Sequence, residues 1–319
     1  MAETQAEKPA AIRRVRLRHH CGYKANLFML RAGGLFLPVG YGLVAAAACW
    51  FWLTDGPSRR ASRGFLTRAA SRGRRSAAWW QTLYHMYIYG QLLLDRSVSL
   101  ADDKGRFKVA SATGDSWREG LNPHRGLLML TAHFGAAELS AVMLKRVGPN
   151  RRANFVVYRD MRDATEHFHR DQWKLLADIQ WINSMEPVAA GLKVMAALKR
   201  REVVAMRADR PMQGRTVTVE FLGRRMQLPA GPFIAAVLSG ADVVSAFTVR
   251  SGYRCYDMHI SMPRLYASVA EGDRDRLAEQ AAKDYTADLE AIVRKYPYQW
   301  GNFYDVWASC AEDGSPHES

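Results

Sequence analysis

The sequence is short of the features that mark several protein classes. Its 319 residues include four cysteines, at positions 21, 49, 255 and 310, which are far apart and form no C-x-x-C pair. This spacing favours neither a disulfide scaffold nor a zinc site, and a reducing compartment is the expectation. The motifs G-x-S-x-G and H-E-x-x-H are also absent. The sequence therefore indicates neither a serine hydrolase of the α/β type nor a zincin metal site.

Positive charge is in excess, but it is not spread over the chain. The formal net charge is +14. Residues 1–75 carry 14 Lys and Arg against three acids, whereas the remaining 244 residues carry 31 basic and 28 acidic groups. The body of the chain is therefore close to neutral. A nucleic-acid binder of high pI would need a basic surface on its folded body, and no binding motif is present, so we expect no nucleic-acid partner.

One long uncharged segment, residues 32–54, lies inside the basic region. About 20 apolar residues are needed to cross the hydrocarbon of a bilayer, and this segment just reaches that length. Its tryptophans suit a membrane interface. We expect a membrane-embedded helix, either spanning or monotopic. The alternatives are a signal peptide, for which no A-x-A cleavage site follows, and a buried core helix.

Basic residues flank the apolar segment on both sides, so the positive-inside rule sets no orientation. Seven arginines lie within residues 59–75. Each basic residue near an anionic lipid surface contributes about 1 kcal/mol of binding. The flanks therefore predict an anionic membrane surface as a partner, with a solvated helix face as the alternative.

From residue 107 onward, strand-like and helix-like segments alternate. Residues 126–132 form a continuous apolar run, as in a strand buried on both faces. The other strands expected are 107–110, 153–158, 203–206, 216–221, 242–250 and 256–261, and the helices are 77–94, 134–146, 163–176, 191–199, 233–238 and 273–295. This alternation predicts an α/β fold with helices on both faces of the sheet and no linker that divides it.

The segment most suggestive of chemistry is T-A-H-F-G-A-A-E-L at residues 131–139. His133 follows the buried strand and is expected at the carboxyl edge of the sheet, where α/β folds bind ligands. Glu138 lies five residues further on and could reach back to the imidazole. A carboxylate there would fix the tautomer and leave the other ring nitrogen as a base. The alternative is an ordinary hydrogen-bonded pair at a strand end.

This segment resembles the H-x4-D/E motif of the glycerolipid acyltransferase superfamily, in the form typical of the late acyltransferases of lipid A biosynthesis. Further blocks follow in the order of that family: V-Y-R at 157–159, V-A-M-R-A-D at 204–209, V-E-F-L-G at 219–223 and L-P-A-G at 228–231. Together they extend over residues 79–307, and their order is more specific than any one block.

The resemblance implies an α/β fold with a mixed sheet and an N-terminal membrane-embedded helix. The domains would be a basic leader (1–31), the membrane helix (32–54), an acyltransferase domain (55–308) and a disordered tail (309–319). The implied activity is transfer of an acyl group from an acyl carrier protein or coenzyme A thioester to a hydroxyl of a membrane lipid. It needs neither metal nor cofactor, and it would take place on the cytoplasmic face of a bacterial inner membrane.

The resemblance also implies roles for particular residues. His133 would be the general base and Glu138 its orienting carboxylate. Arg159 would bind a phosphate or an anionic headgroup, since guanidinium pairs bidentately with phosphate. Asp209 would hold an arginine or the acceptor, and Arg210 would add a phosphate contact or cover the surface. Arg170 is a weaker candidate for substrate binding, with a solvated helix charge as its alternative.

Two blocks depart from the family pattern. Arg210 stands where the family has Gln, and the C-terminal block at 298–307 reads Y-Q-W-G-N-F-Y-D-V-W. That ending resembles relatives associated with other acylated products, such as lipids of the aryl-polyene type. The alternatives are therefore a different acceptor, an inactive membrane protein that binds lipid, or a metallohydrolase that uses His133 and Glu138.

Overall fold

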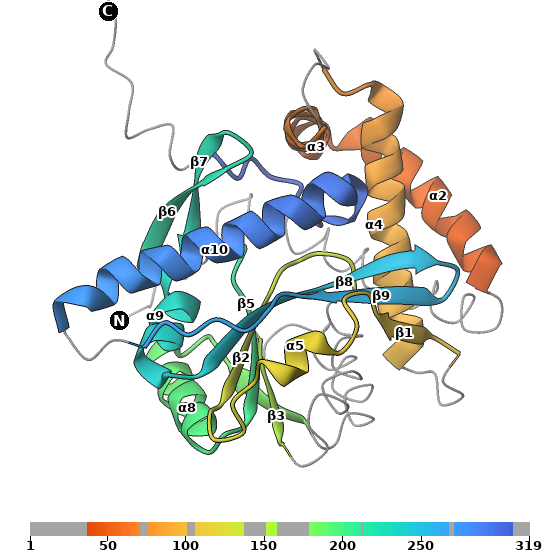
Figure 1. Cartoon of the computed structure of the whole chain (residues 1–319). Coiled ribbons are helices and arrows are strands. Elements are labelled where there is room, and N and C mark those ends of the chain that lie inside the picture. The colour runs from red at the N-terminus through yellow and green to blue at the C-terminus, as the bar shows by residue number, and fades with distance from the viewer. Residues whose placement is uncertain are drawn as a thin grey trace, which may run out of the picture.

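A computed structural model describes residues 37–70, 76–100, 106–136, 151–157, 179–211, 214–267 and 271–308. Within them a seven-stranded sheet has the order β1-β9-β8-β2-β5-β3-β4 (Figure 1). Its strands are β1 (Lys108–Ser111), β2 (Leu127–Thr131), β3 (Ala153–Val157), β4 (Ile179–Asn183), β5 (Val203–Arg207), β8 (Asp242–Gly252) and β9 (Cys255–Ile260). All neighbouring pairs are parallel except β8 and β9, which form an antiparallel hairpin. The predicted α/β fold with a mixed sheet is confirmed.

The central strand β2 is apolar throughout because it is buried on both faces. Leu128 and Leu130 pack in a cluster that includes Tyr285 of α10 (Arg274–Lys295). Leu127 and Met129 pack in the cluster on the opposite face, with Trp117 of α5 (Ser116–Glu119). Helices α8 (Pro187–Lys199) and α9 (Ala230–Ser239) also contribute to the first cluster. Since side chains alternate along a strand, a two-sided core requires an uninterrupted apolar run.

Two strands escape the sequence analysis. The edge strand β4 has only weak alternation of burial, so its pattern is indistinct. Strand β7 (Arg224–Pro229) returns antiparallel along β6 (Thr216–Phe221) to make a separate two-stranded sheet. Leu222 and Gly223 both have positive φ at the turn, as a tight hairpin turn of this kind requires. The analysis recognises that turn but treats the following residues as a loop.

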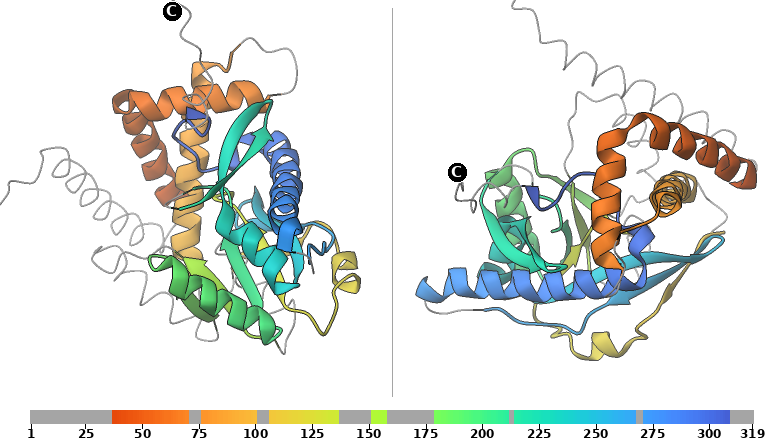
Figure 2. Two further views of the ribbon diagram at one scale, coloured as in Figure 1. Left: turned by 90° about the vertical axis from the view of Figure 1, so that its left-hand side faces the viewer. Right: turned by 90° about the horizontal axis from the view of Figure 1, so that it is seen from above.

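Three helices precede the sheet in the chain: α2 (Leu37–Thr54), α3 (Gly56–Ala69) and α4 (Trp79–Leu100) (Figures 1 and 2). The predicted helices 32–54 and 77–94 correspond to α2 and α4, while residues 32–36 lie outside the described chain. Asp55 ends α2 and caps α3, since its carboxylate accepts from the backbone N of Ser58 at 3.3 Å. By length and composition α2 could cross a membrane, and it alone could do so in the described part of the chain. The leader 1–31, the predicted helix 163–176 and the tail 309–319 lie outside the described residues.

Candidate active site

His133 lies where β2 ends, at the carboxyl edge of the sheet. The helix predicted from residue 134 does not begin there: Phe134 forms an antiparallel bridge with Trp300, and residues 134–136 are not helical. Residues 137–150 lie outside the described chain. Gly135 has φ +57°, and a Cβ atom on it would lie 1.8 Å from the carbonyl oxygen of Thr248. Only glycine allows this close crossing of two backbones directly beside the histidine.

Asp209 is the partner of His133. It follows β5, which pairs with β2, so the two strand ends lie next to each other. Asp209 Oδ1 lies 2.9 Å from His133 Nδ1, and Oδ2 accepts from the His133 backbone N at 2.9 Å. Trp300 Nε1 donates to the same Oδ2 at 3.0 Å. The carboxylate is thus bound by three donors and is fully buried.

The charge state of Asp209 sets the tautomer of the histidine. Burial raises the pKa of the Asp209 carboxyl, but its attraction to His133 and the three hydrogen bonds outweigh burial, so the pKa lies well below its usual range. An ionised carboxylate only accepts hydrogen bonds, so Nδ1 of His133 carries the proton. Nε2 is then the ring nitrogen with a free lone pair. The His133 side chain is 29% exposed, which leaves this nitrogen accessible to a substrate.

The C-terminal block 298–307 closes the site from behind. The Gly301 backbone N donates to the carbonyl of His133 at 2.7 Å, and the Gly135 N donates to the carbonyl of Gln299 at 2.8 Å. The strand end that carries the histidine is therefore held on both sides by one short segment. Gln299, Trp300 and Gly301 are positioning residues that the sequence analysis misses. The available signal is the Q-W-G triplet, which is noted there only as a departure from the family pattern.

The structure places the predicted substrate-binding residues unequally. Asp209, expected to hold an arginine or the acceptor, has its carboxylate committed to His133 and Trp300. Arg210 donates through Nη2 to the carbonyl of Gly301 at 2.9 Å and to Asn302 Oδ1 at 2.7 Å, so it also holds the C-terminal block. Glu138, Arg159 and Arg170 lie outside the described residues, and their roles stay predictions.

A second histidine, His85 of α4, supports the site from below. Its Nε2 lies 2.9 Å from the carbonyl oxygen of Trp300, and its Nδ1 lies 2.9 Å from Ser62 Oγ. Because a carbonyl only accepts, Nε2 carries the proton and Nδ1 accepts from the serine. Burial lowers the pKa of His85 to about 4, although the Trp300 carbonyl acts in the opposite direction. His85 is therefore a neutral link between α3, α4 and the C-terminal block.

This buried histidine predicts an acid-sensitive fold. Between pH about 6.5 and about 4, the unfolded chain binds a proton at His85 that the folded chain refuses, so stability falls as the pH is lowered, by up to about 3 kcal/mol. The variant His85→Gln should show a flatter dependence of the free energy of unfolding on pH in this window. Urea unfolding at the two ends of the window measures it. The exposed loop variant His124→Gln should keep the wild-type slope, and an equal flattening in both variants would contradict the assignment.

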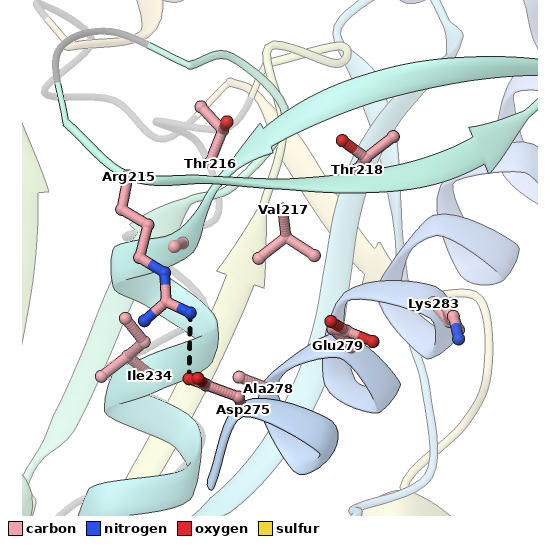
Figure 3. A pocket seen from close by; sticks show the side chains of 10 residues that line it. Arg215, Thr216, Val217, Thr218, Ile234, Asp275, Ala278, Glu279 and Lys283 are labelled. Atoms are coloured by element: carbon pink, nitrogen blue, oxygen red, sulfur yellow. Dashed lines mark ion pairs between the residues drawn. The ribbon is translucent and has the colours of Figure 1, made fainter.

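The most pronounced pocket in the described chain lies elsewhere. It has a volume of about 280 Å³ and is lined by residues of β6, α9 and α10, among them Thr216, Ile234 and Glu279 (Figure 3). An ion pair of 3.1 Å between Arg215 and Asp275 closes one side of it. It shares no residue with the His133 site. Within the described ranges, no group of three or more His, Cys, Asp or Glu is placed to hold a metal ion.

Fold and site together define a class of protein. A histidine at the edge of an α/β sheet, with one ring nitrogen held by a buried carboxylate and the other accessible, is the arrangement of an enzyme that uses general base catalysis. The chain belongs to the bacterial lipid A biosynthesis acyltransferases, since the model of that family matches residues 111–309. The matched range contains His133, Asp209 and the C-terminal block, and it leaves α2, α3 and α4 outside. A comparison with curated protein sequences found no match.

Family membership confirms the resemblance seen in the sequence. The chain is an acyltransferase, and its family indicates transfer of an acyl group onto a lipid acceptor. Association with a membrane is typical of the family, and α2 adds weak evidence for it.

Proposed function

We propose that the chain moves a fatty acyl group from a thioester, carried by acyl carrier protein or coenzyme A, to a hydroxyl of a lipid or glycolipid. The reaction takes place on the cytoplasmic face of a bacterial inner membrane. The observation that carries the proposal is the contact between His133 Nδ1 and the buried Asp209. It supports a base at Nε2 without any nucleophilic serine or cysteine.

In the proposed reaction, Nε2 of His133 takes the proton from the acceptor hydroxyl as its oxygen attacks the thioester carbonyl. The new C–O bond forms, the C–S bond breaks, and the imidazolium returns the proton to the departing thiolate. Asp209 stabilises the imidazolium while it exists. General base catalysis of this kind supplies about 10²–10⁴-fold of rate, and positioning and stabilisation of the oxyanion supply the rest.

The remaining candidates take roles around this pair. Glu138 keeps the predicted role of a second carboxylate that stabilises the imidazolium, since Asp209 is bonded to Nδ1. Arg159 is proposed to bind the phosphate of the donor or of an anionic headgroup, and Arg170 is a weaker candidate for the same contact. Arg210 is proposed to act through the C-terminal block, because its guanidinium is bonded to Gly301 and Asn302.

A second acceptor class follows from the C-terminal block. Its residues contact His133 through Gly301 and Asp209 through Trp300, so its departure from the family pattern bears directly on the site. The alternative is an acceptor other than a lipid A precursor, such as a lipid of the aryl-polyene type. The remaining alternative is a chain that binds lipid without turnover.

The full-length chain in membranes tests the proposal. Supplied with acyl carrier protein or coenzyme A thioesters, it should release free thiol and produce a lipid one acyl group heavier. Mass spectrometry of lipids from cells with and without the chain should show the same product, and its headgroup names the acceptor class. Unchanged lipid profiles, together with no thiol release from either donor, would contradict an acyltransferase and favour a lipid-binding protein.

A further inference from the structure

Helix α2 lies antiparallel along α4 over nearly its whole length. Tyr41 near its start donates to Asp95 near the end of α4 at 2.5 Å. Val44 packs so closely on Gly90 that a Cβ atom there would lie 2.6 Å from the valine side chain. At the other end, Trp52 Nε1 donates to Thr82 Oγ1 at 2.8 Å. One face of α2 is therefore committed to the protein along the entire helix.

The opposite side of α4 is bonded to the catalytic body over the same length. Gln81 donates to Tyr298 Oη at 3.1 Å, and His85 contacts the carbonyl of Trp300. Asp95 receives a hydrogen bond of 2.5 Å from Tyr256 of β9 and lies 3.2 Å from the guanidinium of Arg250. Helix α4 is thus sandwiched between α2 and the sheet.

This packing is incompatible with α2 crossing a bilayer. Its 18 residues measure about 27 Å, close to the roughly 30 Å of the hydrocarbon core, so a spanning helix would use its full length. The partners of Tyr41, namely Asp95 and Arg250, would then lie at hydrocarbon depth together with the end of the sheet. Ionised groups at that depth are costly, and here they belong to the folded body.

Large apolar side chains are exposed at one end of this helical assembly. Trp50 and Leu53 in the last turn of α2 are 66% and 67% exposed, and Phe51 is 56% exposed. Trp79 and Trp80 in the first turn of α4 are exposed beside them, since Trp79 contacts the ring of Trp52 at 5.9 Å. We call these five residues and the exposed side of α3 the end face.

Helix α3 lies across this end, above the tips of α2 and α4 (Figure 2). Its inner side is buried through Phe65, Leu66 and Ala69. The helix carries four arginines and no acid, and Arg60 and Arg63 are exposed. Arg59 packs over the ring of Trp52 at 4.9 Å and donates to its carbonyl. A basic helix lying in one plane with tryptophan and leucine side chains is the pattern of an interfacial membrane element.

We propose that the end face docks on an anionic lipid surface, and that α2 does not span the membrane. Trp50, Phe51, Leu53, Trp79 and Trp80 enter the boundary between headgroups and acyl chains, and the α3 arginines lie among the phosphates. A second copy of the chain fits poorly, because two arginine helices without acids would repel. The inference deepens the proposed function by naming the surface where the acceptor is met, but vesicle binding tests it without any turnover.

Binding of the full-length chain to vesicles is the first test. On vesicles of phosphatidylglycerol and phosphatidylcholine in equal parts, Trp50→Ser with Phe51→Ser should weaken binding by about tenfold or more, since two large side chains no longer leave water. The matched control is Val188→Ser with Leu192→Ser on α8, where the side chains are 79% and 68% exposed. This control should bind as the wild type does. Equal loss in both variants, or no loss in the first, overturns the proposal.

Charge gives an independent measurement. Arg60→Glu should weaken binding to the phosphatidylglycerol vesicles severalfold and leave binding to pure phosphatidylcholine unchanged. All variants should retain the wild-type melting temperature, because these side chains are exposed. His133→Ala should bind vesicles normally, so loss of turnover with intact binding would count against the proposed function alone.

Topology separates docking from spanning. In a chain without its native cysteines, Val39→Cys and Ser76→Cys should both react with a membrane-impermeant maleimide from the cytoplasmic side only. Val39 lies near the start of α2 and is 50% exposed, while Ser76 lies beyond α3. A spanning α2 would place these positions on opposite sides, so labelling of Val39→Cys from the periplasmic side overturns the proposal.

Discussion

Replacing His133 by alanine is expected to remove acyl transfer almost completely. The variant loses the nitrogen that accepts the hydroxyl proton, and a general base is worth about 10²–10⁴-fold in rate. The loss should fall on turnover at saturating thioester rather than on donor binding, because the base acts in the transition state. Single-turnover release of thiol by the membrane-bound full-length chain measures it.

The control for this prediction is His124→Ala, since His124 is an exposed loop residue away from the sheet edge. It should retain wild-type turnover. Glu138→Ala should also lose transfer, as the sequence motif predicts, while the protein stays folded in the membrane fraction. If His133→Ala and Glu138→Ala both kept near wild-type turnover, the general base mechanism would be wrong.

Asp209→Asn should be nearly as damaging, with turnover lower by about 10³–10⁴-fold, the size of effect known when the carboxylate of a catalytic triad becomes an amide. The amide nitrogen would face His133 Nδ1 and donate to it, because the Trp300 Nε1 and the His133 backbone N occupy the other carboxylate oxygen. Nδ1 would then accept and Nε2 would carry the proton. A protonated Nε2 cannot take a proton from the acceptor.

The measurement should include the imidazole itself, since a purely structural role would not change the tautomer. Nitrogen NMR of His133 should show protonated Nδ1 in the wild type and protonated Nε2 in the variant. Asp242→Asn is the matched control: this carboxylate is also buried in the sheet, but at the start of β8, where it accepts from the Asn122 backbone N at 2.7 Å. Equal losses of turnover in the two variants, with no tautomer change, would reduce Asp209 to a structural residue.

Some of this site is readable from neighbouring residues. An uninterrupted apolar run before His133 is enough to place the histidine at the end of a central strand, because only a strand buried on both faces needs such a run. The pairing with Asp209 is not readable in that way. The two residues are 76 positions apart, and their contact depends on β5 lying next to β2 in the sheet. Local patterns state that both strands exist but not their order.

Trp300 and Gly301 illustrate the same limit from the other side. They lie in a short irregular segment whose backbone groups bond to His133, and irregular backbone has no periodicity to read. Glu138, in contrast, is close in sequence to His133, so the motif draws attention to it while the equally relevant distant carboxylate passes as a residue for substrate binding.

The sequence by itself determined the α/β class, the position of His133 and the family, because these follow from local hydrophobic patterns and from blocks of adjacent residues. Only the tertiary structure decided which carboxylate holds the imidazole and what α2 can do. The uncharged segment is long enough to span a bilayer on composition alone. Its neighbours are what bar it from spanning, since Tyr41 is bonded to Asp95 and lies against Arg250, groups brought together from three distant parts of the chain.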